Sequence, residues 1–212
     1  MRIIVFGANG QFGTRIVNEA LAGGHQVTAF VRKAQSLPLV HENLTIQVGD
    51  VRHAADTIAA IQGHDAVISA LGPGGPGVSD QHLDVLTEGI PHLIEGMWAA
   101  GIKRIIVLGS VATLEAAPGV MIRDTPHFPT FARNISGAHW EAAQALAASG
   151  MEWTIVCPPL RIEAGERTGH YRLQDEQAIP GEGRISYEDM AHFILNELGQ
   201  RQHLYRKVNI AY

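Results

Sequence analysis

The chain has 212 residues, of which 46% are hydrophobic and 17% charged, a composition that supports a folded core and excludes a disordered chain. The formal net charge of −5, without any run of Lys and Arg, argues against a nucleic-acid-binding surface. A single cysteine excludes an intrachain disulfide, and the sequence has neither a signal-peptide pattern nor an apolar run of about 18 residues, so we expect a cytoplasmic protein without a membrane span.

Short apolar runs alternate with longer helical patterns along the chain. Nearly continuous apolar runs are typical of strands that are covered on both faces, and their alternation with helices indicates βαβ units. The sequence therefore predicts an α/β, Rossmann-like fold: one doubly wound parallel sheet with helices on both faces, in a single domain over residues 1–212. The predicted strands are 3–6, 27–31, 44–48, 66–71, 104–110 and 153–157, and the predicted helices are about 11–22, 54–62, 80–100, 137–149 and 186–198.

Particular residues mark the ends of the predicted helices. Ser186 and Asp189 form a capping-box pattern at the start of the last helix. Gly101 and Gly150 follow helical runs and are expected at helix C-termini. Pro91 lies inside the helix predicted over 80–100, which we expect it to kink or split.

Residues 111–136 are the least regular part of the chain. They contain three prolines and little periodic hydrophobicity, which is typical of a loop, and loops of this length often lie over binding sites. We expect this segment, together with residues 158–185, to form a small substrate-covering part of the same domain.

The first predicted strand is followed by three glycines spaced three residues apart. Glycine adopts the backbone angles of tight turns and lets the main chain approach a phosphate, and a helix that begins here offers unpaired N–H groups and a partial positive charge. Such a loop between a strand and a helix is typical of dinucleotide binding, and an ordinary turn is the alternative. The residues expected to hold a pyrophosphate are Gly7, Asn9, Gly10, Gln11, Phe12 and Gly13.

The second predicted strand ends at Arg32, where an adenosine ribose is expected. An acidic residue at this point would accept from the ribose 2′-hydroxyl, whereas a guanidinium can donate two parallel hydrogen bonds to a 2′-phosphate. Arg32 therefore favours NADP(H) over NAD(H) as the cofactor. The alternative is a solvated surface arginine, and Lys33 would add charge in either case.

The next two strand ends carry small or polar residues. We expect Asp50 to accept a hydrogen bond from the adenine amino group while Val51 packs on the ring; the alternative is that Asp50 caps the following helix. Ala70, Leu71 and Gly72 would let a ribose or nicotinamide lie close, unless this stretch is only a flexible turn. All these residues fall at the carboxyl edge of the predicted sheet, where open α/β folds bind ligands.

The segments GANGQFG, FVRK, GDV, SALG, IIVLGS and WTIVCPP give the chain a resemblance, over nearly its whole length, to the atypical short-chain dehydrogenases with an NAD(P)-binding, NmrA-like domain. Within that family it is most similar to the biliverdin-IXβ reductase and flavin reductase group, on CPPLRI, RTGHYRL and the helix that carries His139. The resemblance implies a serine, Ser110, that bonds the substrate carbonyl or the nicotinamide amide. It also implies that the residues beside the ribose and nicotinamide are Gly109, Ser110, Pro158, Pro159 and Leu160.

The chain departs from these relatives at several positions. Classical short-chain dehydrogenases use a Tyr and a Lys four residues later as a proton-donating pair, and here Ile135 and His139 stand in those places. The reductase group usually has a His after the Pro-Pro turn, where this chain has Leu160 and Arg161. It also tends to have a second phosphate-binding Arg near Ser36, which is missing here.

Without the Tyr–Lys pair, we expect hydride transfer to an acceptor that needs little acid help, namely a flavin-, quinone- or tetrapyrrole-like planar ring. Ser110 and His139 are the candidate catalytic residues; a strand-end serine bonded to backbone and a packing histidine are the alternatives. For the whole protein, the alternatives are a non-catalytic NADP(H)-binding redox sensor and a nucleotide-sugar epimerase. The eleven histidines are scattered singly, and no metal site is expected.

Overall fold

The computed structural model describes residues 1–74, 82–181 and 183–212. Its centre is an eight-stranded sheet in the order β10-β12-β8-β5-β4-β1-β2-β3, in which the antiparallel pairing of β10 with β12 is the exception to parallel pairing. The predicted Rossmann-like fold is confirmed. The strands are β1 (Arg2–Phe6), β2 (Gln26–Val31), β3 (Leu44–Val48), β4 (Ala66–Ser69), β5 (Arg104–Leu108), β8 (Glu152–Cys157), β10 (Arg172–Asp175) and β12 (Arg206–Ala211).

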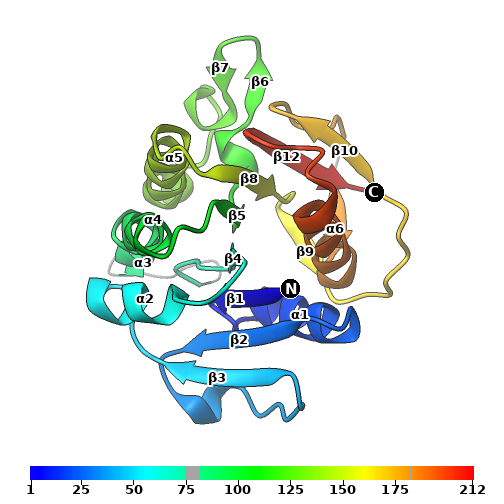
Figure 1. Cartoon of the computed structure of the whole chain (residues 1–212). Coiled ribbons are helices and arrows are strands. Elements are labelled where there is room, and N and C mark those ends of the chain that lie inside the picture. The colour runs from blue at the N-terminus through cyan, green and yellow to red at the C-terminus, as the bar shows by residue number, and fades with distance from the viewer. Residues whose placement is uncertain (75–81, 182) are drawn as a thin grey trace.

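Helices cover both faces of the sheet (Figure 1). On one face lie α1 (Gln11–Ala22) and α6 (Tyr187–Gln200), which pack against each other. On the other face lie α2 (Ala54–Ile61), α3 (Asp84–Thr87), α4 (Gly89–Ala100) and α5 (Arg133–Ala148).

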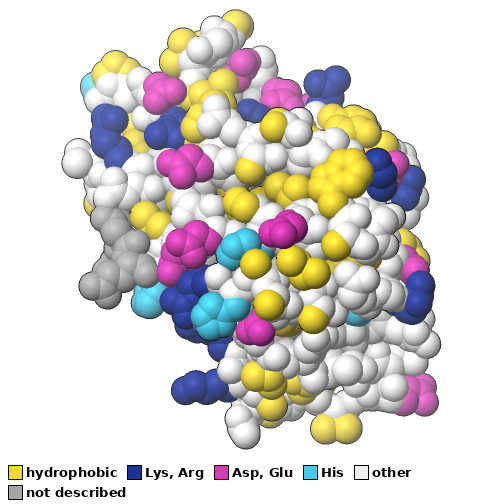
Figure 2. Space-filling view, turned by 60° about the vertical axis from the view of Figure 1, so that its left-hand side comes forward, with side chains coloured by type: hydrophobic (Ala, Val, Ile, Leu, Met, Phe, Trp, Pro, Cys, Tyr) yellow, Lys and Arg dark blue, Asp and Glu magenta, His cyan; other side chains and the backbone are white. Residues whose placement is uncertain are grey.

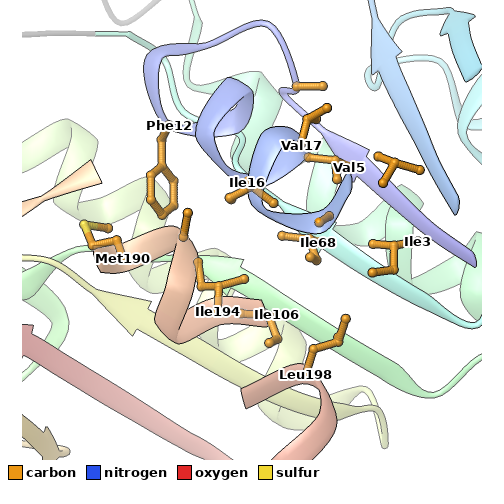
Figure 3. Close-up of a cluster of buried hydrophobic side chains, with 14 of the residues drawn as sticks. Ile3, Val5, Phe12, Ile16, Val17, Ile68, Ile106, Met190, Ile194 and Leu198 are labelled. Carbon is orange, nitrogen blue, oxygen red and sulfur yellow. The ribbon is translucent and has the colours of Figure 1, made fainter. Parts of the chain in front are cut away.

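The sheet separates two apolar cores because successive strand residues point to opposite faces. In β1, Ile3 and Val5 belong to the core beneath α1 and α6, whereas Ile4 and Phe6 belong to the core beneath α2, α4 and α5. Figure 3 shows the first core, where Ile16 of α1 and side chains of α6 meet those of the strands. Burial on both faces explains why the strands are apolar almost throughout.

The helix predicted over 80–100 is split, as expected, but not at the expected residue. The break lies at Glu88, between α3 and α4, and Pro91 falls in the first turn of α4. A proline is tolerated there because the first amides of a helix have no intrahelical acceptor. Residues 80 and 81 of this prediction lie outside the described residues.

Several strands were missed. Residues 111–136, predicted as a loop, contain the hairpin of β6 (Glu115–Ala117) and β7 (Val120–Met121), and α5 begins inside this segment. β12 was not predicted either, although its Val208 and Ile210 are fully buried. A further short pair joins β9 (Arg161–Glu163) to β11 (Arg184–Ser186).

The helix-end signals are confirmed. The Ser186 hydroxyl caps α6 by accepting from the Asp189 backbone N–H at 3.0 Å, and Gly101 ends α4 with a left-handed φ of 69°. Gly150 also has a left-handed φ, of 69°, one residue after the C-cap of α5. Asp189 does not complete the reciprocal box, because its buried carboxylate accepts from Thr168 and from the Tyr212 hydroxyl instead.

Candidate functional site

A cleft of about 290 Å³ opens at the carboxyl ends of β1, β2, β3 and β4. Parallel pairing brings these four ends to one edge of the sheet, although they are far apart along the chain. Residues that the sequence indicated for a cofactor line this cleft together: Gly7, Asn9, Gly10, Arg32, Asp50, Val51, Ala70, Leu71 and Gly72.

Two glycines of the loop are required by its geometry. Gly7 has a left-handed φ of 74°, and a Cβ on it would lie 2.6 Å from the carbonyl oxygen of Ala70. A Cβ on Gly13 would lie 2.1 Å from the carbonyl oxygen of Gly7. A side chain on Gly7 would therefore push the loop away from the end of β4, and a side chain on Gly13 would push α1 away from the loop.

Helix α1 begins beside the cleft, and its first backbone amides have no intrahelical acceptor. Its N-cap, Gly10, provides no side-chain cap, and the first turn carries no acidic residue. The first intrahelical bond joins the Thr14 N–H to the Gly10 carbonyl at 3.0 Å, so the amides of residues 11–13 have no intrahelical acceptor. The positive end of the helix dipole is thus open to an anion.

The side chains of Gln11 and Phe12 are not part of the cleft lining. The Phe12 ring is buried in the core, near Tyr187 and Met190 (Figure 3), so its side chain does not contribute to the cleft. The Gln11 carboxamide is exposed and accepts a hydrogen bond from Arg15.

Arg32 lines the cleft one residue beyond the end of β2. Its side chain is exposed, and no carboxylate within the described parts of the chain forms an ion pair with it. The guanidinium is therefore available to an anionic ligand in the cleft.

Asp50 is held by Arg52, a cleft residue that sequence reasoning missed. The Arg52 guanidinium donates to both carboxylate oxygens, which lowers the pKa of Asp50 to about 2 against the opposing effect of burial. The N-cap of α2 is His53, so the alternative in which Asp50 caps that helix is not what the structure shows. The signal that could have found Arg52 is its position two residues after an acidic residue at the same strand end.

The residues that the family resemblance placed beside the ribose and nicotinamide lie beyond the lining of this cleft. Ser110 follows β5, and its Oγ accepts from the Ala112 N–H at 3.3 Å, while its own proton has no acceptor among the described residues. Pro158 and Pro159 are buried, whereas Leu160 is 94% exposed. Gly109 is required by packing, since a Cβ there would lie 2.4 Å from the Ile155 side chain.

His139 lies half-buried in α5, where burial lowers its pKa to about 4. The imidazole is therefore neutral at pH 7 and does not supply a charged acid near neutral pH. Ile135, one turn earlier, has no polar group, so no Tyr–Lys type of pair stands on this helix. These observations favour the packing alternative for His139.

Other kinds of site were sought in the described residues. Within 1–74, 82–181 and 183–212, no three His, Cys, Asp or Glu side chains converge as metal ligands would. The helices of these segments include none that is both long and apolar enough to cross a membrane. On the face shown in Figure 2, the coloured Lys and Arg side chains lie among Asp, Glu and His side chains rather than in one basic area.

Comparison with known proteins identifies a family for the chain. The sequence matches the model of a family described as NAD(P)H-binding over residues 7–201. The uncharacterized protein YwnB of Bacillus subtilis is 32% identical over 210 residues, covering 96% of this chain and 94% of the relative. A Bacteroides thetaiotaomicron structure provisionally described as an epimerase is 30% identical, with a TM-score of 0.86 over 100% and 96% of the two chains. A Streptococcus pneumoniae structure provisionally described as an NADH-flavin reductase is 28% identical, with a TM-score of 0.83 over 100% and 99%.

Proposed function

Because the chain belongs to the NAD(P)H-binding family, we propose that it is an NADPH-dependent reductase that transfers hydride to a flavin-, quinone- or tetrapyrrole-like ring. The expected relationship to NAD(P)-binding proteins is confirmed by the family match, and the choice of NADPH and of a planar acceptor is our proposal. The observation that carries it is the cleft, which combines a glycine loop, the N-terminus of α1 and Arg32, a cation that pairs with no carboxylate of the described residues.

In this proposal each part of NADPH would have its own residues in or near the cleft. The glycine loop and the first amides of α1 would hold the pyrophosphate, and Arg32 would hold the 2′-phosphate. Asp50 and Val51 would hold the adenine. Val51 is buried and packs close to Gly89, because a Cβ added to Gly89 would lie 3.1 Å from the Val51 side chain. The residues proposed beside the ribose and nicotinamide are Ala70, Leu71, Gly72, Gly109, Ser110, Pro158, Pro159 and Leu160.

The protein would contribute orientation and the exclusion of water rather than strong acid catalysis. The reduced nicotinamide, when bound, supplies the hydride. The Ser110 hydroxyl proton, which has no acceptor among the described residues, could orient a carbonyl or an amide, and His139 is neutral. A planar acceptor fits this site because its ring delocalises the incoming electron pair and solvent can supply the proton.

The proposal also concerns the segments around the site and the compartment. Residues 111–136 and 158–185 would cover the substrate.

A cytoplasmic location fits the one cysteine, Cys157, which is free and buried. Burial raises the pKa of its thiol to about 12, so it is an inert core residue.

Mixing the protein with NADPH and a panel of FMN, quinones and biliverdin tests the proposal. We expect the nicotinamide absorbance band to disappear only when protein and one of these acceptors are both present. NADPH binding without oxidation by any acceptor would favour the sensor described next, and absence of NADPH binding would contradict both functions.

A non-catalytic redox sensor is the second candidate. It is favoured by Ile135 and by the neutral His139, which leave α5 without a proton-donating pair. An epimerase acting on nucleotide sugars is the weaker third candidate. The Bacteroides relative supports it by its description, but such enzymes usually retain the pair and have a larger substrate domain.

A further inference from the structure

Arg52 donates three hydrogen bonds to the Asp50 carboxylate. Its backbone N–H and its Nε donate to Asp50 Oδ1 at 3.1 and 2.9 Å, and its Nη2 donates to Oδ2 at 2.5 Å. A carboxylate offers about four acceptor positions, so one, on Oδ2, is left for a ligand. The carboxylate cannot rotate without breaking at least two of these bonds.

Arg52 also contacts the first residue of α3. Its Nη1 donates to Oδ2 of Asp84 at 3.4 Å. Asp84 is the first residue of α3, and neighbouring residues of that segment, His82 and Val85, line the same cleft. The guanidinium therefore joins the loop after β3 to α3 beside the cleft.

The two arginines of the cleft differ in charge balance. The positive charge of Arg52 is offset by two carboxylates, those of Asp50 and Asp84. The three side chains together carry one net negative charge. Arg32 faces no such partner among the described residues. A phosphate is attracted to Arg32, whereas the group of three suits a neutral ligand that donates a hydrogen bond.

We propose that Arg52 is a positioning residue for the base of the cofactor: it aims the remaining acceptor position of Asp50 at the exocyclic amine of adenine. This inference rests on the proposed function, in which the cleft holds NADPH. A base with a carbonyl in place of that amine would set two acceptors against each other and bind more weakly.

The test measures dissociation constants for NADPH and for its hypoxanthine analogue, in which a carbonyl replaces the adenine amine. We expect the wild-type protein to prefer NADPH by at least about tenfold, the lower range for a hydrogen bond to a charged group. Arg52→Ala should weaken NADPH binding and reduce the preference to about threefold or less. Arg52→Lys should restore it in part, because an ammonium keeps the charge but not the fork.

Two further variants separate positioning from a structural role. Arg32→Ala, the matched control, should weaken both ligands by the same factor and leave the preference unchanged. Asp50→Asn should abolish or reverse the preference with Arg52 in place, since an amide can donate to the carbonyl, and it serves if Arg52→Ala does not fold. Thermal unfolding reports folding for each variant.

The outcomes are distinguishable. Equal loss of both ligands in Arg52→Ala, with the preference intact, would overturn the positioning role. A wild-type protein that binds NADPH without preferring it over the analogue would also overturn it, while leaving the proposed function in place. A wild-type protein that binds neither ligand would overturn the proposed function as well.

Discussion

In the proposed function, the choice between the two nicotinamide cofactors would depend on Arg32. Its guanidinium is exposed beside the cleft, and no carboxylate of the described residues competes for it. The neighbouring cation, Arg52, is already engaged by Asp50 and Asp84. Of the two arginines that line the cleft, Arg32 is therefore the one that could meet a 2′-phosphate without first giving up an ion pair to a described residue.

Arg32→Ala should weaken NADPH binding by about 1.5–3 kcal/mol and leave NADH binding nearly unchanged, because hydrogen bonds to charged groups contribute in that range. Titration of the variant and the wild type with both dinucleotides measures this. Arg2→Ala, which removes a surface arginine paired with Asp65, is the control and should change neither affinity. Equal losses for NADPH and NADH would refute the 2′-phosphate assignment.

His139 should make stability depend on pH in a defined window. Its folded pKa of about 4 lies below the ordinary value of 6.5, so between these values the unfolded chain takes up a proton that the native protein does not. The contribution of neutral His139 to the free energy of unfolding is therefore fully present above pH 6.5, and it is lost as the pH falls toward 4. For this half-buried side chain the loss is at most about 3 kcal/mol.

His139→Gln removes the titrating group, so the variant should lose less stability than the wild type between pH 7 and pH 5. Urea unfolding at the two pH values gives the comparison, and exposed His53→Gln serves as the control. The same loss in the His139 variant and in the wild type would show that other groups dominate this range.

At the scale of elements, the contact between α1 and the glycine loop sets the shape of the site. The helix can lie against the loop only because residue 13 has no Cβ. The sequence showed three glycines, and the structure assigns them different tasks: Gly7 turns the chain at positive φ, Gly10 starts the helix and Gly13 permits the close contact.

Gly13→Ala should therefore lower the free energy of unfolding by about 1–3 kcal/mol, the range for overpacking, and weaken cofactor binding by displacing the amides of α1. Gly199→Ala is the matched control, since this residue of α6 has no atom within 4 Å of an added Cβ. That variant should be neutral or more stable by up to about 1 kcal/mol. Denaturant unfolding and NADPH titration of both variants provide the measurement, and similar effects would contradict the packing argument.

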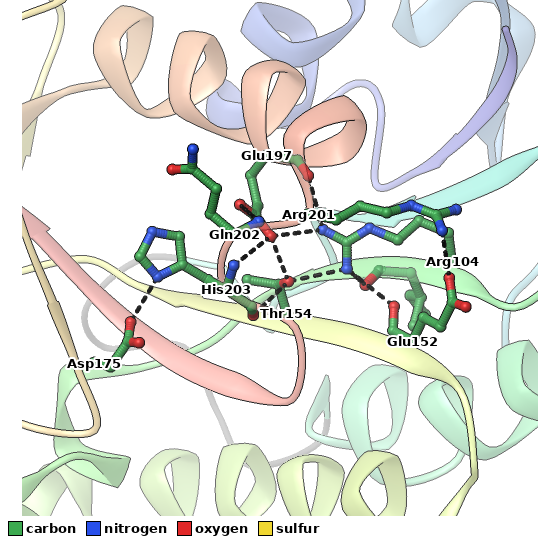
Figure 4. Close-up of polar contacts among 9 residues, drawn as sticks. Arg104, Glu152, Thr154, Asp175, Glu197, Arg201, Gln202 and His203 are labelled. Carbon is green, nitrogen blue, oxygen red and sulfur yellow. Dashed lines mark hydrogen bonds and ion pairs between the residues drawn. The ribbon is translucent and has the colours of Figure 1, made fainter.

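At the scale of the molecule, a buried polar network joins distant parts of the chain (Figure 4). Arg104 at the start of β5 donates to Glu197 of α6 at 3.0 Å and to Thr154 of β8 at 2.9 Å. Both charged side chains are 1% exposed. Glu197 also accepts from the backbone N–H groups of Gln202 and His203, which fixes the turn that leads into β12.

Glu197→Ala should lower the free energy of unfolding by about 3–5 kcal/mol, because it leaves Arg104 as an uncompensated buried charge. Asp65→Ala, which breaks the exposed pair with Arg2, should cost less than about 1 kcal/mol. Urea unfolding of the two variants compares a buried with an exposed pair. Equal costs would mean that the network at Arg104 contributes no more than a surface contact.

The sequence by itself determined β1 to β5 and β8 of the central sheet, the alternation of these strands with helices, the glycine loop, the helix ends at Ser186 and Gly101, and Arg32 at a strand end. These features depend on hydrophobic periodicity and on backbone preferences, which act over a few residues. The tertiary structure alone decided that Arg52 would reach Asp84, that β12 would join the sheet, and that Arg104 would meet Glu197. Each of these contacts joins segments that are far apart along the chain, so it depends on which segments the parallel crossovers bring together. The buried charge of Arg104 is stable only because Glu197 lies beside it.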